Sequence, residues 1–177
     1  MAKKYIPLLP IVLHGSPVPD EDGNLEERNI VDTSFYFAGK KVILFGLPGA
    51  FTPTCTNEML PTYEELHDKF CKDFGLDAIY CTSVNDDYVM EAWAKSLDVT
   101  KIEMIPDGNG VLALALNMLV KKENLGFGKR SWRYAAYIDD GEIKLMLEEE
   151  GKEHNCEDDP YEVSDPANMY KELKKLL

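Results

Sequence analysis

Two patterns of apolar residues alternate along the chain: short continuous apolar runs, and segments in which apolar residues recur every three or four positions. Runs rich in β-branched or aromatic residues predict buried strands at 40–47, 76–85 and 101–106. A helix that ends at Gly75 is predicted by apolar residues at helical spacing, namely Met59, Tyr63, Leu66, Phe70 and Phe74. A second helix is predicted over 86–99 with Asp86 as its N-cap, and a short one over 111–119. Strands and helices are therefore expected to alternate.

The last part of the chain predicts a hairpin followed by a helix. Residues 132–150 carry an Asp-Gly turn between two strand-like runs, which indicates an antiparallel β-hairpin. Residues 164–177 form an amphipathic helical pattern that begins at Ser164 or Asp165. This order indicates an α/β protein with a central mixed β-sheet flanked by helices, of the thioredoxin-like type, ending in a C-terminal hairpin plus helix.

The first residues predict an extended N-terminal segment. Pro7 and Pro10 break the apolar stretch that follows the two N-terminal lysines, and no clear small-residue cleavage site follows. We therefore interpret this stretch as an N-terminal extension of the fold rather than a signal peptide. No linker or repeat interrupts the chain, so we expect a single domain over residues 1–177.

Charge and cysteine content narrow the possible partners and compartments. The chain has a net charge of −13, which repels nucleic acids and acidic membranes. No apolar run approaches the roughly 20 residues of a membrane span. The cysteines show no CxxC spacing and no evident disulfide framework; they are Cys55, Cys71, Cys81 and Cys156. Free thiols are typical of a reducing compartment, so we expect a cytoplasmic location.

Three short patterns hint at ion or phosphate sites and fail on spacing. "DEDGNLEE" resembles the start of a calcium loop, but its sixth and twelfth positions are Leu25 and Val31. "GFGKRS" lacks the remaining glycines of a phosphate loop and precedes a predicted strand. His154 and Cys156 form a lone pair of possible metal ligands. We therefore expect no metal and no cofactor.

Cys55 stands where the first long strand gives way to the first long helix. In the first turn of a helix, unpaired N–H groups and the helix dipole favour the thiolate over the thiol. A lone cysteine is more often structural, but Pro48, Gly49 and Pro53 build a stiff turn around this one. Thr52 occupies the position of the first cysteine of a CxxC pair, so a hydroxyl replaces a second thiol. The sequence therefore favours a reactive nucleophile.

The segment "PGAFTPTC", from Pro48 to Cys55, resembles the active-site motif of the peroxiredoxins in its type-5 (type-II) form. "GKKVILFGLPGAFTPTCT", "SVNDDYVMEAWAKS" and "RSWRYAAYIDDG" are similar to blocks of that subfamily in the same order, and "DPYEVSDPANMYKEL" is similar to the tail of bacterial members. The resemblance covers nearly the whole chain. It implies a thiol-dependent peroxidase on a thioredoxin-like fold.

The resemblance also implies a role for each residue of the motif. Cys55 would be the peroxidatic cysteine, whose thiolate attacks a hydroperoxide and becomes sulfenic acid. Thr52 would hydrogen-bond the thiolate and the bound peroxide, and Pro48 would shield the sulfur and shape the pocket. Arg133 would stabilise the thiolate and the charge on the leaving oxygen, with Arg130 as the weaker candidate.

One position departs from the family pattern. Many members carry a histidine four residues after the catalytic cysteine, and this chain has Met59 there. The histidines of the chain match no part of the motif; they are His14, His67 and His154. Activation of Cys55 is therefore expected to rest on the helix terminus, Thr52 and Arg133.

The second half of the cycle must return the sulfenic acid to the thiol. We expect a one-cysteine mechanism in which an external thiol, either glutathione with glutaredoxin or thioredoxin, reduces it. Cys81 matches a cysteine of some plant-type relatives, but it falls on a predicted buried strand. Cys156 lies in a polar loop that could fold back onto the site, although acidic neighbours disfavour its thiolate. Both stay candidate resolving cysteines, whereas Cys71 is expected to be structural.

Several readings of function stay open at this point. The sequence does not rank hydrogen peroxide, alkyl hydroperoxides and peroxynitrite as substrates. A disulfide oxidoreductase on the same fold is disfavoured by the absence of CxxC. A redox-switched binding or holdase protein that signals through oxidation of Cys55 is the alternative from another class. The family resemblance further implies a homodimer that packs near the active-site loop.

Overall fold

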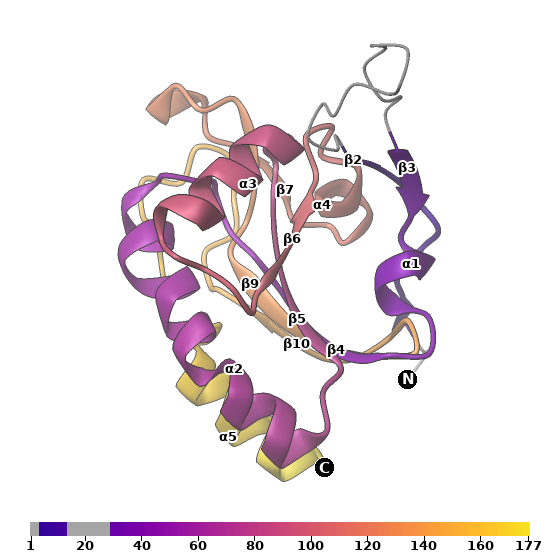
Figure 1. Ribbon diagram of the computed structural model, residues 1–177. Helices are drawn as coiled ribbons and strands as arrows, with labels where there is room; N and C mark the ends of the chain where they lie inside the picture. Colours follow the sequence, from indigo (N-terminus) through magenta and orange to yellow (C-terminus); the bar gives the residue numbers. More distant parts are fainter. Residues whose placement is uncertain (1–3, 14–28) are drawn as a thin grey trace.

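The computed structural model describes residues 4–13 and 29–177, and its centre is a mixed β-sheet (Figure 1). The sheet has six strands in the order β1-β10-β9-β4-β5-β6. Their bounds are β1 Lys4–Tyr5, β4 Lys41–Gly46, β5 Ala78–Ser83, β6 Glu103–Pro106, β9 Tyr134–Asp139 and β10 Glu142–Glu148. Strands β4, β5 and β6 are parallel, whereas β9, β10 and β1 join antiparallel. The expected mixed sheet is therefore confirmed. The calcium-like segment at 20–27 lies outside the described residues.

Helices cover both faces of this sheet (Figure 1). Their bounds are α1 Ser34–Phe37, α2 Leu60–Phe74, α3 Asp87–Ser96, α4 Val111–Ala115 and α5 Pro166–Leu176. Alternate residues of β4 face opposite sides, because side chains alternate along a strand. Ile43 and Phe45 pack in the core under α2, α3 and α5, while Val42 and Leu44 pack in the core under α1 and α4. The thioredoxin-like α/β fold expected from the sequence is what the chain adopts.

The end signals in the sequence correspond to real element ends. Gly75 closes α2 in the left-handed conformation, with φ 64°. Asp86 caps α3 by accepting from Val89 N–H at 3.0 Å. Of the two candidates at the last helix, Asp165 is the N-cap of α5. These predictions are confirmed because each depends on a local hydrogen bond or a local backbone angle.

Two short ribbons were not predicted. β2 Pro10–Leu13 pairs with β3 Asn29–Asp32, and β7 Leu119–Lys121 pairs with β8 Lys129–Ser131. Strands of three or four residues are too short to show an alternating pattern, and each ribbon depends on a partner elsewhere in the chain. The β7–β8 ribbon matters for function because it leads directly into Trp132 and Arg133.

Candidate active site

The active-site turn connects β4 to α2 through a tightly bonded loop. Helical geometry begins at Pro53, and Cys55–Met59 form one π-helical turn before α2 continues. Thr56 N–H donates to Thr52 O at 3.0 Å, whereas Leu60 N–H reaches five residues back to Cys55 O. Pro61 follows at once and has no N–H for an ordinary helical bond, so the change of register falls where the backbone bonding is already interrupted. Cys55 thus lies in the first turn, as predicted.

Arg133 brings a positive charge to the sulfur of Cys55. Its Nη1 lies 3.5 Å from Cys55 Sγ and 3.5 Å from Met59 Sδ. Both Cys55 and Arg133 are buried, with 0% and 1% of their surface exposed. The fold carries Arg133 there at the end of the connection from β8 to β9, 78 residues away from Cys55 in sequence. A buried guanidinium beside a thiol favours the anionic sulfur.

The remaining nitrogens of Arg133 are held by the loop between β10 and α5. Nε donates to Pro160 O at 2.9 Å, and Nη2 forms an ion pair with Asp159 Oδ1 at 2.5 Å. Burial disfavours the charged guanidinium, but the negative charges of Cys55 and Asp159 outweigh burial and raise the pKa of Arg133 above its usual value. Arg133 therefore stays charged in the site.

Thr52 and Pro48 lie on the loop before Cys55, as expected. Thr52 Oγ1 donates to Gly49 O at 2.8 Å, so its hydroxyl hydrogen is directed at that carbonyl rather than at the sulfur. Thr52 and Pro48 both line a cavity of about 370 Å³, together with Pro53, Thr54, Lys122, Leu125, Phe127 and Asp159. The expected hydrogen bond from Thr52 to the thiolate stays a prediction.

Arg130 contacts the backbone of the active-site loop rather than the sulfur of Cys55. Its Nη1 lies 3.4 Å from Pro48 O and 3.4 Å from Asn85 Oδ1. Asn85 Oδ1 also accepts from Ala50 N–H at 3.0 Å, so one amide oxygen joins the loop to Arg130. Gly49 leaves the room for this approach, because a Cβ there would lie 2.5 Å from Arg130 Nη1. Of the two arginines, it is Arg133 that contacts Cys55.

Sequence reasoning did not single out Asn85 or Asp159. Asn85 follows the carboxyl end of β5, and a polar residue at that edge of a parallel sheet is a usable signal. Asp159 is the third of three consecutive acidic residues, and nothing in their spacing shows which one meets Arg133.

The other cysteines lie in different environments. Cys81 is fully buried on β5, and burial raises the pKa of its thiol well above the usual value, with the charge of Cys55 adding to the effect. Cys156 lies in the loop between β10 and α5, as expected, but its side chain is buried. Only 8% of it is exposed, and it packs with Val120 and Trp132 in the core cluster on the side away from Cys55. Burial against these side chains explains the difference.

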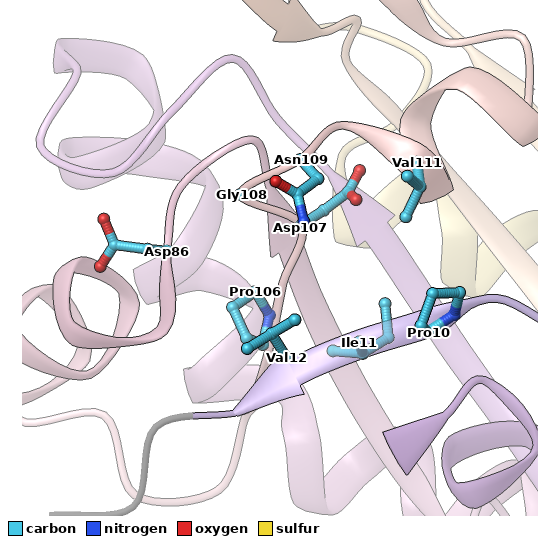
Figure 2. Close-up of a pocket in the computed structure, with 9 residues that line it drawn as sticks. All are labelled: Pro10, Ile11, Val12, Asp86, Pro106, Asp107, Gly108, Asn109 and Val111. Carbon is cyan, nitrogen blue, oxygen red and sulfur yellow. The ribbon is translucent and has the colours of Figure 1, made fainter. Parts of the chain in front are cut away.

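A second cavity, of about 350 Å³, lies between β2 and the turn that follows β6 (Figure 2). Its one buried charged residue is Asp107, whose carboxylate accepts from Leu112 N–H at 3.0 Å and from Ala113 N–H at 2.8 Å. Burial raises the pKa of Asp107, while these hydrogen bonds oppose the shift. Figure 2 shows Asp86 pointing away from the other labelled residues. The carboxylate of Asp107 thus accepts the free N–H groups at the start of α4.

Within residues 4–13 and 29–177, no cluster of three or more His, Cys, Asp or Glu side chains is arranged to hold a metal ion. Over the same residues, no helix combines the length and the apolar character of a membrane span.

The thioredoxin-like fold, with one cysteine at a helix start beside a buried arginine, defines a thiol-based redox protein. A family model described as Redoxin matches residues 13–163. Peroxiredoxin y4vD of Sinorhizobium fredii is 53% identical over 142 residues, covering 80% of this chain and 75% of that protein. The chain belongs to the peroxiredoxins, in the type-5 (type-II) subfamily, and is a thiol-dependent peroxidase.

Solved structures agree with this assignment. The Plasmodium falciparum antioxidant protein, described as a 1-Cys peroxiredoxin, has a TM-score of 0.87 and 39% identity, covering 97% of this chain and 98% of that one. Reduced Prx3 of Vibrio vulnificus, solved in complex with H2O2, has a TM-score of 0.79 and 33% identity, covering 98% and 99%.

Proposed function

We propose that this peroxiredoxin reduces hydrogen peroxide and alkyl hydroperoxides with Cys55 as the peroxidatic residue. The observation that carries the proposal is the 3.5 Å contact between Arg133 Nη1 and Cys55 Sγ in the first helical turn. The thiolate attacks one peroxide oxygen, and the O–O bond breaks. The leaving oxygen takes a proton to become water or an alcohol, and Cys55 becomes sulfenic acid. Arg133 stabilises the thiolate and the charge that develops on the leaving oxygen.

The loop before Cys55 supplies the rest of the site. Thr52 lines the cavity, and its hydroxyl, which now donates to Gly49 O, is assigned the hydrogen bond to the thiolate and to a bound peroxide. Pro48 lines the same cavity and is assigned the shielding of the sulfur. The Leu125 and Phe127 side chains in the cavity wall offer contacts to an alkyl group. The complex of the Vibrio vulnificus relative with H2O2 supports the smaller substrate.

The reduction step is assigned to a thiol outside the chain, either glutathione with glutaredoxin or thioredoxin. Cys81 is fully buried and its raised pKa keeps it protonated, while Cys156 packs in the other core cluster. The description of the Plasmodium falciparum relative as a 1-Cys peroxiredoxin agrees with this assignment. The reductant attacks the sulfenic sulfur, releases water and leaves a mixed disulfide that a second thiol resolves.

A homodimer in the cytoplasm completes the proposal. Phe51, on the active-site turn, is 57% exposed with φ 61°, a strained conformation for an aromatic residue. A second copy packed near this turn would cover the ring. All four cysteines are free thiols, which agrees with a reducing compartment. Sedimentation velocity of the protein and of a Phe51→Ser variant tests the dimer, and a monomeric native protein would refute it.

The peroxidase assignment is tested with three cysteine variants under one reductant at a time. Cys55→Ser should abolish peroxide consumption, whereas Cys81→Ser and Cys156→Ser should retain most of it. Mass spectrometry of the peroxide-treated protein should show sulfenic acid at Cys55, and a mixed disulfide after glutathione is added. Turnover by Cys55→Ser would refute the assignment, and loss of turnover in either other variant would refute the one-cysteine cycle. Negligible turnover with oxidation-dependent partner binding would favour the switched binding protein instead.

A further inference from the structure

The loop between β10 and α5 is anchored by two buried ionisable side chains, Lys122 from the segment after β7 and Glu149 at the start of the loop itself. We call residues 156–164 of this loop the C-terminal strap. Lys122, 2% exposed, donates from Nζ to two carbonyl oxygens at its start, at 2.9 and 3.3 Å. Glu149, also 2% exposed, accepts at its end from Ser164 N–H at 2.8 Å and Ser164 Oγ at 2.6 Å. The strap is therefore fixed at both ends to groups that are costly to leave unpaired.

Between these anchors the strap holds the guanidinium that faces Cys55. Pro160 O accepts from Arg133 Nε, and Asp159 accepts from Nη2. Because the guanidinium is a planar fork, fixing Nε and Nη2 also fixes the direction of Nη1. Nη1 is the nitrogen that lies 3.5 Å from Cys55 Sγ. The aromatic ring of Tyr161 lies 5.5 Å from the guanidinium carbon and covers one face of it.

We propose that Asp159 is a positioning residue for the reaction of Cys55, because its ion pair with Arg133 holds the guanidinium against the sulfur. The inference rests on the proposed roles of Cys55 and Arg133 and goes beyond them. It assigns part of the catalytic geometry to a segment about a hundred residues away from the active-site motif. It also assigns a function to one residue of the acidic run at 157–159, a pattern that otherwise indicates a solvated loop.

Two effects of Asp159 on the sulfur have opposite signs, and the experiment can separate them. As a bare negative charge, Asp159 disfavours a second anion nearby, so its removal would make Cys55 more reactive at low pH. As a holder of Arg133, Asp159 favours the thiolate, so its removal would make Cys55 less reactive. The direct effect is screened by solvent because 44% of the Asp159 side chain is exposed. Positioning is therefore the effect expected to dominate.

The test compares Asp159→Ala and Asp159→Asn with the neighbouring control Asp158→Ala, which removes the same charge from the same loop. Thermal unfolding and circular dichroism check that each variant is folded. Single-turnover oxidation of Cys55 by hydrogen peroxide should fall about tenfold or more in Asp159→Ala, since a displaced catalytic group can cost up to about a hundredfold. Asp159→Asn, which keeps an oxygen acceptor, should restore part of the rate. Asp158→Ala should stay within about twofold of the native rate.

Iodoacetamide alkylation of Cys55 across pH supplies a readout that loss of stability would not move. Positioning predicts that the midpoint of the alkylation profile moves to higher pH in Asp159→Ala. A midpoint that stays or moves to lower pH would overturn the proposal. In an Arg133→Met background, Asp159→Ala should cause no further change in alkylation rate, whereas additive effects would also overturn it. If these tests refute the role of Asp159 while Cys55→Ser is inactive, the proposed peroxidase function is unaffected.

Discussion

Substitution of Arg133 by methionine removes the positive charge beside Cys55 and keeps an unbranched, though shorter, side chain. The guanidinium nitrogen lies 3.5 Å from the sulfur, and Coulomb's law with an effective dielectric constant of about 20 gives about 5 kcal/mol for a unit pair at this distance. Part of this is offset, because burying the guanidinium itself costs free energy and water can enter the variant site. A net loss of about 2–3 kcal/mol corresponds to about a hundredfold in rate.

The assay is the second-order rate of Cys55 oxidation by hydrogen peroxide, followed by tryptophan fluorescence and confirmed by mass spectrometry. Arg133→Met should lower this rate about a hundredfold, consistent with the loss of one transition-state donor. The rate of Arg133→Lys should lie between those of the native protein and Arg133→Met, since lysine keeps the positive charge but lacks the planar guanidinium fork. Lys129→Met, on the surface of the same segment, is the matched control and should react normally. A folded Arg133→Met protein that reacts within about threefold of the native rate would refute the electrostatic argument.

Three further outcomes are expected. Gly46→Ala should lower stability by about 1–3 kcal/mol in urea unfolding, because its Cβ would lie 2.1 Å from the buried Tyr134 ring, and a native-like midpoint would contradict this. Cys81 should resist alkylation in the native protein at about pH 8 and react once unfolded, since burial raises its pKa; rapid native labelling would disprove the inertness assigned to it. Burial raises the pKa of Glu149, but hydrogen bonds from Ser164 and neighbouring N–H groups hold it below the ordinary 4.5. Its folded pKa is thus below its unfolded pKa, and the stability it contributes is present above 4.5 and lost as pH falls below it. The stability deficit of Glu149→Gln at neutral pH should accordingly shrink in acid, and a deficit independent of pH would count against this account.

The peroxidatic turn could be predicted from the sequence because its determinants are local. A strand, a stiff proline-containing turn and a helix start occupy consecutive residues, so Cys55 had to lie in a first helical turn. The end signals at Gly75 and Asp86 are local for the same reason. The family motif then pointed to Arg133 ahead of Arg130, although two arginines within four residues cannot be ranked by position alone.

Tertiary structure alone decided which charges meet at the sulfur. Arg133 reaches Cys55 because β9 pairs with β4 in a register that places Tyr134 opposite Gly46. Asp159 reaches Arg133 because Lys122 and Glu149 fix the strap, and no periodic pattern in the sequence encodes such contacts. The burial of Cys156 is a further example, since its acidic, polar sequence neighbours give no sign of the long-range packing that buries that side chain. The sequence determined the nucleophile and its helix, whereas the electrostatic environment depends on the pairing of β9 with β4 and on loop anchors, which are contacts between residues that are not neighbours in the sequence.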